Sequence, residues 1–425
     1  MVEIRGFRGL RFDAEKTGPL DDVLTPPYDV ITEAERQALA GRSAYNMTHL
    51  ILPESDGNAT PYAAAANVMR AWMNDGVLCP DPAPSLYLLR QQFTGPDGKT
   101  FERCAFFGLL KLPEPGEHFI LGHERTFDKP VADRLALMQA TQANLEPIFV
   151  MYSDESGTFR ESLYAPLATE TPLLRARTSD GVTQELWRVP CPPALDAHFE
   201  NQTLYIADGH HRFKTACTYR DTCRASGGTD APPQGHDYVM AGFVAFEDPG
   251  LKIYAAHRVL PAPYPIDFEA FLYQLRHYFD CKPLDTDAAE AEFTKTDPDA
   301  CSLVMCVHEH GTWLLTLKEE TRQELVGTDR APAWRALDVA VLHQGILTRL
   351  LELPETTALL YEKNARHACT QVESGEAALA FLLRPTKPEQ VRACATASEP
   401  MPQKATYFYP KLPSGAVMYD FSLLE

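Results

Sequence analysis

The sequence predicts a mixed α/β fold of the α+β type, in which helices pack on a mixed sheet. Segments with the apolar pattern of strands alternate along the chain with segments that have the 3.6-residue period of amphipathic helices. The chain has 425 residues, of which 45% are hydrophobic and 23% charged, so it can bury a large core. This length fits either two domains or one elaborated α/β domain.

Helices are expected where a local start signal precedes an amphipathic pattern. Residues 32–40 begin with a Thr-x-x-Glu capping box, and residues 60–74 begin with Thr-Pro, which suits the first turn of a helix. Residues 267–279 and 334–353 also show the helical period. All four segments are therefore predicted to be helices.

Strands are expected in two antiparallel hairpins and in three further segments. Strands at 86–93 and 101–112 flank the turn TGPDGK, and strands at 302–307 and 312–317 flank the turn HEHG. The further strands are expected at 148–152, 203–207 and 238–246. Because HEHG occupies a hairpin turn, its histidines are interpreted as turn residues rather than metal ligands.

A segment rich in Pro and Ala, residues 257–265, is the best candidate for a domain boundary. We expect residues 1–257 to form an N-terminal region that carries the functional site described below. Residues 258–425 are expected to form a C-terminal α/β region, which returns Lys404 and Lys411 towards that site.

The charge balance of the chain is acidic, with 39 Lys and Arg against 58 Asp and Glu and a formal charge of −19. This charge repels phosphate backbones and anionic membranes, so neither nucleic acid nor a membrane is expected as a partner. A start without a signal-peptide pattern predicts a cytoplasmic protein. The ten cysteines lack a CxxC motif and are expected to be reduced. The sequence leaves the oligomeric state open.

The stretch LYIADGHHRFKTA gathers unusual residues between a predicted strand and a predicted helix. Asp208, Gly209, His210, His211 and Arg212 follow the carboxyl end of the strand, where open α/β sheets bind ligands. The glycine permits close approach of the backbone to a ligand. The helix start supplies unpaired N–H groups and the positive end of the helix dipole. These features favour an anion as the ligand. A plain solvated helix start is the alternative interpretation.

The chemistry of this turn favours phosphate over a metal. Arg212 can clamp phosphate oxygens, and His210 and His211 can donate hydrogen bonds. Asp208 can orient a histidine or bind a metal. However, consecutive histidines on a helix point about 100° apart, unlike the pair in a zinc-binding HExxH motif. The sequence contains neither GxxxxGK[ST] nor GxGxxG after a strand, so phosphate binding depends on this turn.

Seven motifs occur along the chain: RGFRGLR, PPYDVI, GHERTF, ATQANLEPIF, ADGHHR, AAHRVL and MPQKATYFYPKLPSG. With these motifs the chain resembles a large bacterial and archaeal family called domain of unknown function 1015. The resemblance extends from Arg5 almost to Val417.

This family is similar, more distantly, to the superfamily of the ParB nucleotide-binding domain, sulfiredoxin and the free-serine kinases. The similarity lies in a GxxR pattern at a helix start, which Gly209 and Arg212 match, with the small residue Ala216 four positions after the arginine. In those relatives the turn holds nucleotide phosphates. The resemblance therefore implies a ParB/sulfiredoxin-like nucleotide-binding core with large insertions and a C-terminal lobe, and it implies ATP or ADP with Mg²⁺ as cofactors.

Two further motifs carry candidate catalytic residues. In GHERTFDKPVADR, Glu124 is the candidate base for a substrate hydroxyl, and His123 and Arg134 are candidate phosphate contacts. A capped helix start with surface ion pairs explains this stretch equally well. In TPPYDVI, Asp29 is an alternative base or magnesium ligand, ranked below Glu124.

The C-terminal half contributes weaker candidates. Lys404 and Lys411 can neutralise phosphate charge, although a tail strand that packs its aromatic side chains in the core also explains their motif. His257 and Arg258 in AAHRVL either approach the same site or are structural. His343, on an apolar helical stripe, is interpreted as an interior histidine rather than a ligand.

The combined prediction is a nucleotide-dependent kinase that phosphorylates a small hydroxyl metabolite, with free L-serine as one candidate. The turn at 208–212 is expected to hold the donor phosphates with Mg²⁺, while Glu124 or Asp29 activates the hydroxyl. Two alternatives stay open. One is a nucleotide-responsive binding module without phosphoryl transfer, and the other is a metal-dependent hydrolase built on Asp208, His210 and His211.

Overall fold

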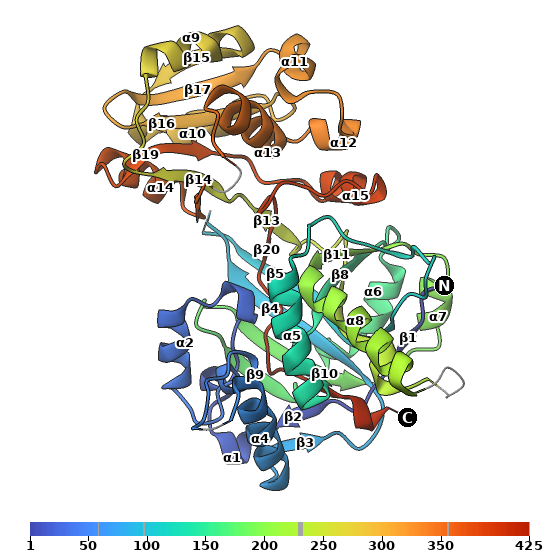
Figure 1. Ribbon diagram of the computed structural model, residues 1–425. Coiled ribbons are helices and arrows are strands. Elements are labelled where there is room, and N and C mark those ends of the chain that lie inside the picture. The colour runs from blue at the N-terminus through green and yellow to red at the C-terminus, as the bar shows by residue number, and fades with distance from the viewer. Residues whose placement is uncertain (58, 97, 228–232, 355–356, 425) are drawn as a thin grey trace. The chain divides into compact units, whose positions relative to one another are not determined.

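The computed structural model describes residues 1–57, 59–96, 98–227, 233–354 and 357–424. The chain folds into two compact units (Figure 1). The first unit comprises Met1–Gly122, Thr126–Lys252 and Pro410–Glu425, and the second comprises His123–Arg125 and Ile253–Tyr409. Each unit combines a sheet with helices, so the predicted mixed α/β class is confirmed.

A mixed sheet of nine strands organises the described part of the first unit. The strands are β1 (Ile4–Arg5), β4 (Leu86–Thr94), β5 (Thr100–Lys111), β6 (Ile120–Leu121), β8 (Ile148–Tyr152), β9 (Leu174–Arg177), β10 (Thr183–Val189), β11 (Leu204–Asp208) and β12 (Tyr238–Ala245). Their order is β6-β11-β8-β12-β5-β4-β10-β9, with β1 paired to β5. The pairs β8–β12 and β6–β11 are parallel, whereas β8 and β11 run antiparallel.

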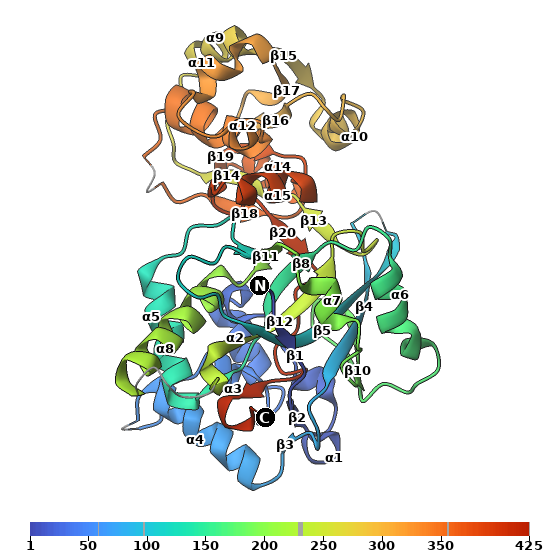
Figure 2. The ribbon, with the colours of Figure 1, turned by 90° about the vertical axis from the view of Figure 1, so that its right-hand side faces the viewer.

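Helices cover the sheet of the first unit (Figure 2). Helix α5 (Asp128–Thr141) packs against α8 (His210–Gly227), and α4 (Pro61–Asn74) packs against α5. On one face of the sheet, Phe106 of β5 stacks on Phe243 of β12 with ring centroids 4.7 Å apart. The short helices α6 (Thr158–Tyr164) and α7 (Leu195–Phe199) add aromatic side chains to this buried cluster. The core therefore holds β11 and α8 in place behind the turn that joins them.

The C-terminal segment, residues 410–424, lies on the opposite face of the same sheet. A Cβ on Gly242 would lie 2.4 Å from the Leu412 side chain, and Gly242 points away from the face that carries Phe243. Strand β21 (Tyr419–Asp420) in this segment pairs with β7 (Ala143–Asn144). The segment thus joins the first unit although it follows the whole second unit in the chain.

A six-stranded antiparallel sheet organises the described part of the second unit. The strands, in sheet order, are β15 (Phe279–Leu284), β17 (Gly311–Leu317), β16 (Ser302–Val307), β19 (Ala377–Leu382), β14 (His257–Pro261) and β18 (Leu360–Glu362). Helices α9 (Phe268–Tyr278), α14 (Ala365–Glu373) and α15 (Pro388–Thr396) accompany it. None of the helices in the described ranges has the length and apolar composition needed to span a membrane.

The local predictions from the sequence agree well with these elements. Both hairpins are confirmed, since β4 pairs with β5 and β16 with β17, and the residues of HEHG before Gly311 form the turn. The capping box of α2 (Glu33–Ala40) is confirmed, with Thr32 and Glu35 bonded in both directions. The expected helix at 334–353 is not continuous, because Leu337 is extended and separates α12 (Pro332–Arg335) from the helical turns that follow.

Candidate functional site

The turn between β11 and α8 has a backbone shape that requires glycine. Strand β11 ends at Asp208 and α8 begins at His210, and Gly209 between them has φ +87°. This left-handed conformation is unfavourable for residues with a side chain. A Cβ at this position would also lie 3.1 Å from the guanidinium group of Arg212. The glycine therefore lets Arg212 fold back over the start of its own helix.

Gly209→Ala is expected to destabilise the first unit by about 1–3 kcal/mol. The introduced alanine would adopt a strained left-handed conformation, and its Cβ would lie too close to the guanidinium group of Arg212. Gly116→Ala is the matched control, since Gly116 has φ +92° but open space around it. Urea unfolding of both variants checks the prediction. Equal losses at the two positions would mean that the contact with Arg212 adds nothing to backbone strain.

Asp208 is held between two cations. Its Oδ2 accepts a hydrogen bond of 2.7 Å from Nη2 of Arg212, and its Oδ1 accepts one from Nζ of Lys411. Nη1 of Arg212 donates to the carbonyl oxygen of Pro147. Burial alone would raise the pKa of Asp208, but Lys411 and Arg212 hold it well below its ordinary value. Asp208 is therefore a carboxylate throughout the physiological pH range.

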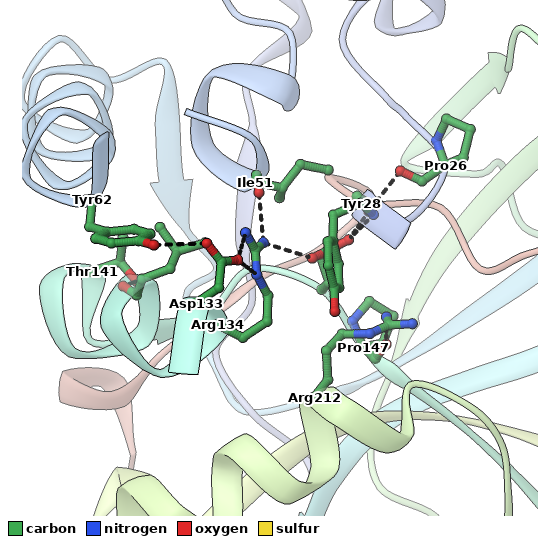
Figure 3. Close-up of polar contacts among 12 residues, drawn as sticks. Pro26, Tyr28, Ile51, Tyr62, Asp133, Arg134, Thr141, Pro147 and Arg212 are labelled. Carbon is green, nitrogen blue, oxygen red and sulfur yellow. Dashed lines mark hydrogen bonds and ion pairs between the residues drawn. The ribbon is translucent and has the colours of Figure 1, made fainter. Parts of the chain in front are cut away.

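A second buried ion pair joins Glu146 to Arg134. Figure 3 shows Tyr28 between the side chains of Arg134 and Arg212. Oε1 of Glu146 accepts hydrogen bonds from the backbone N–H of Tyr28 at 2.9 Å and from Oγ of Ser414 at 3.0 Å. Its Oε2 lies 4.0 Å from Nη1 of Arg134, whose guanidinium group lies 4.1 Å from the centre of the Tyr28 ring. Burial raises the pKa of Glu146 above its ordinary value, although Arg212 and Arg134 oppose the shift.

We call Arg134, Glu146, Asp208, Arg212 and Lys411 the charge cluster. Their side chains are at most 14% exposed, and they comprise three cations and two carboxylates. Asp133 also pairs with Arg134 at 2.6 Å, but its side chain is 40% exposed, so solvent screens that charge. The buried part of the cluster thus has a surplus of positive charge.

A cavity reaches the charge cluster between α5 and α8. Its wall includes Arg134, Glu146, Arg212 and Thr215, together with apolar side chains of α5. Nε of Arg212 is buried and has no hydrogen-bond partner among the described residues. A buried donor without a partner is costly in free energy. An anion in this cavity would accept that hydrogen bond and balance the surplus charge.

The two histidines of the turn differ in their surroundings. His210 is 5% exposed, and burial lowers its pKa to about 3, so it is neutral at physiological pH. Nε2 of His211 lies 3.1 Å from the backbone nitrogen of Phe127, which donates to it, and the two rings stack. In this tautomer, Nε2 of His211 is an acceptor for the backbone rather than a donor to a phosphate.

The remaining predicted residues fall into two groups. Asp29 is exposed, belongs to the first unit and interacts electrostatically with Arg212. His123, Glu124 and Lys404 belong to the second unit. There, Nε2 of His123 lies 3.1 Å from Oγ1 of Thr406, and Lys404 is exposed with φ +52°. The structure thus brings Asp29, Arg134, Asp208, Arg212 and Lys411 together within the first unit.

Asp208, the predicted metal ligand, contacts two cationic side chains in this structure. Both carboxylate oxygens of Asp208 already accept hydrogen bonds from cations, Lys411 and Arg212. Within the described ranges, no group of three or more His, Cys, Asp or Glu side chains is placed to hold a metal ion. Metal binding at Asp208 stays a prediction.

Two residues of the site were not identified from the sequence. Glu146 lies in ATQANLEPIF directly before a buried strand, and a carboxylate in such an apolar run is a signal of a buried ion pair. Arg103 of β5 is fully buried, and its Nε donates to Oε1 of Gln91 at 3.0 Å. Nε2 of Gln91 donates in turn to the carbonyl oxygen of Lys411 at 2.9 Å. Arg103 thereby supports the backbone that presents Lys411 to Asp208.

The fold and the site define a mixed α/β protein with a buried, positively charged cluster behind a strand–helix turn. A family model described as "Protein of unknown function (DUF1015)" matches residues 4–340. The chain therefore belongs to this family, which confirms the resemblance that the motifs indicated. No curated protein matches the chain.

Several solved structures show a weak similarity to the chain. A "Free serine kinase in complex with AMP" has a TM-score of 0.35 and 13% identity, covering 72% of this chain and 90% of that one. "SbnI with C-terminal truncation from Staphylococcus aureus" has a TM-score of 0.37 and 12% identity, covering 73% and 86%. A "Conserved hypothetical protein from Pyrococcus furiosus" has a TM-score of 0.33 and 13% identity, covering 72% and 94%. These TM-scores are too low to establish a shared fold.

Proposed function

We propose that this protein is a nucleotide-dependent phosphotransferase. It holds the phosphates of ATP or ADP at the turn 208–212 and transfers a phosphoryl group to the hydroxyl of a small metabolite, with free L-serine as one candidate acceptor. The observation that carries the proposal is the buried Nε of Arg212, which has no partner among the described residues while its side chain lines a cavity. An oxyanion is the ligand that this donor lacks.

Three features support a phosphate rather than another anion. The surplus positive charge of the charge cluster favours a ligand with a high negative charge. Gly209 has no side chain to block the approach of a phosphate to the backbone at the start of α8, an 18-residue helix whose first N–H groups attract anions. The GxxR pattern of Gly209 and Arg212 at the start of α8 resembles the phosphate-binding turn of the ParB, sulfiredoxin and free-serine kinase superfamily.

The position of Asp29 supports a role as the general base. It is exposed, so an acceptor can reach it, and it lies in the first unit within electrostatic range of Arg212. In the transfer step, the acceptor oxygen forms a bond to the terminal phosphorus of the nucleotide and the anhydride P–O bond breaks. The hydroxyl proton passes to the carboxylate of Asp29, and the shortened nucleotide leaves. Glu124, in the second unit, is the other candidate base.

Nucleotide binding is tested by isothermal titration calorimetry of ATP and ADP with the full chain. Arg212→Met is expected to weaken binding about 10- to 100-fold, because it removes a charge-assisted hydrogen bond. Arg42→Met is the control, since Arg42 is an exposed arginine of the same unit. Arg212→Lys keeps the charge on α8 and guards against simple misfolding. The proposal fails if millimolar nucleotide does not bind, or if Arg212→Met and Arg42→Met bind equally well.

Phosphoryl transfer is tested separately. The protein is incubated with ATP or ADP, Mg²⁺ and a panel of hydroxyl metabolites that includes L-serine, and products are followed by ³¹P NMR. Asp29→Asn is expected to abolish transfer while nucleotide affinity stays within about twofold, because the base contributes to chemistry rather than to binding. Tight binding without transfer to any acceptor would support the nucleotide-responsive binding module instead.

A further inference from the structure

Arg258 of β14 is a buried cation in the second unit, and the hydrogen bonds described for it go to neutral groups. Its side chain is among the largest fully buried ones, at 1% exposure for the residue. Nε donates to Nε2 of His343 at 2.9 Å, and Nη2 donates to the carbonyl oxygens of Gln403 at 2.9 Å and Lys404 at 3.1 Å. Among the described residues, no carboxylate pairs with Arg258.

These contacts leave the charge of Arg258 uncompensated. Burial lowers its pKa to about 10, which still leaves the group positively charged at neutral pH. His343 cannot balance this charge, because burial lowers its own pKa to about 3 and the ring is neutral. A buried, unpaired charge is unfavourable unless a counter-ion is bound.

A cavity within the second unit is lined by both Arg258 and a second arginine, Arg384. Arg384 donates to Oγ1 of Thr296 and, at 2.8 Å, to the carbonyl oxygen of Ala300, so these hydrogen bonds also go to neutral oxygens. Asp338 is the one carboxylate among the residues that line this cavity, and burial raises its pKa. The wall therefore carries two positive charges against at most one negative charge.

The rest of the cavity wall suits a compact oxyanion. Thr386 and Gln390, at the start of the nine-residue helix α15, provide polar groups and the positive end of a helix dipole. Small and aliphatic side chains, among them Ala255, Ala256 and Ala405, close the remaining sides.

Two motifs of the family meet at this cavity. Arg258 belongs to AAHRVL, and the carbonyl groups that it binds belong to MPQKATYFYPKLPSG. The proposed phosphotransferase chemistry of the first unit uses neither Arg258 nor these carbonyl groups. The motifs therefore point to a separate role in the second unit.

We propose that the cavity lined by Arg258 and Arg384 is a binding site for a small oxyanion, a phosphate or a carboxylate, separate from the nucleotide site of the first unit. The two guanidinium groups supply the charge, and the start of α15 supplies the polar wall. Inorganic phosphate and acetate are the probes for the two ligand types.

The test uses the full chain in an Arg212→Met background, so that phosphate cannot report on the first unit. Titration calorimetry with inorganic phosphate is expected to show one saturable site. Adding Arg384→Met is expected to weaken it about 10- to 100-fold, whereas adding Arg366→Met, an exposed arginine of the same unit, leaves it unchanged. Arg384→Lys, which retains the charge, is expected to give an intermediate affinity and guards against loss of the fold.

Competition by acetate distinguishes the ligand types. If millimolar acetate displaces phosphate, the site binds carboxylates as well as phosphate. If acetate does not displace phosphate, the site is specific for phosphate. The proposal is overturned if neither anion binds saturably, or if Arg384→Met binds phosphate as tightly as Arg366→Met. Because nucleotide binding is measured with Arg212 intact, failure of this inference leaves the proposed function of the first unit untouched.

Discussion

Truncation of the chain after Tyr409 is expected to unfold the first unit. The missing segment, residues 410–424, supplies Lys411 to Asp208 and Ser414 to Glu146, so its loss leaves two buried carboxylates short of partners. It also removes Leu412 from its place against Gly242 and removes the partner of β7. Each of these losses costs on the order of 1–5 kcal/mol, and together they exceed the stability of an ordinary domain.

Calorimetric unfolding of the truncated and complete chains checks this prediction. The truncated chain is expected to lose the heat absorption of the first unit and its nucleotide affinity together. A shorter truncation that removes only residues 424 and 425 is the control and is expected to unfold like the complete chain. If the first unit keeps its unfolding transition after the long truncation, the C-terminal segment is not required for its fold.

Replacing Asp208 with asparagine is expected to lower the free energy of unfolding by about 3–5 kcal/mol, because Arg212 and Lys411 lose their shared counter-charge in a buried setting. Asp221→Asn is the matched control. Asp221 also pairs with an arginine of α8, at 2.8 Å, but its side chain is 65% exposed, so the expected loss is below about 1 kcal/mol. Urea unfolding at pH 7 measures both. A loss below about 1 kcal/mol for Asp208→Asn would contradict the ion-pair interpretation.

The effect of Asp208 is also expected to depend on pH. Its pKa in the folded chain lies below that of the unfolded chain, about 3.9, so its ionised form stabilises the fold above that value. The stabilisation is lost as the pH falls towards the folded pKa. The difference in unfolding free energy between the natural chain and Asp208→Asn is therefore expected to be constant from pH 7 to 5 and to shrink below about pH 4. A constant difference down to pH 3 would exclude this linkage.

Local signals in the sequence were sufficient to predict most helices and strands and the turn between β11 and α8. Turn residues define both hairpins, the Thr32 and Glu35 pair defines the start of α2, and the glycine in ADGHHR marks the left-handed residue between β11 and α8. These features depend on interactions between residues a few positions apart. Hydrophobic periodicity and capping patterns report such interactions directly.

The composition of the charge cluster depends on contacts that local patterns do not report. Lys404 and Lys411 stand only seven positions apart, yet Lys411 binds Asp208 and Lys404 belongs to the other unit. The chain returns from the second unit to the first between Tyr409 and Pro410, so only the lysine after this point belongs to the charge cluster. Likewise, GHERTF places His123 and Glu124 in the second unit, whereas Arg134, eleven residues after His123, lies in the first. Glu146 had a usable signal, since it stands between the buried apolar residues Leu145 and Ile148, whereas Arg103 follows the charged Glu102 and had none.

The position of residues 410–424 after the second unit in the sequence also bears on how the protein is made. The ribosome completes the strands β1 to β12 and then must add the 157 residues Ile253–Tyr409 before Lys411 emerges. At about 5–20 residues per second, this interval lasts roughly 10–30 s. During that time the nascent first unit holds Asp208 without Lys411, Glu146 without Ser414 and Gly242 without Leu412. Its folding is thus completed only after the second unit has been synthesised.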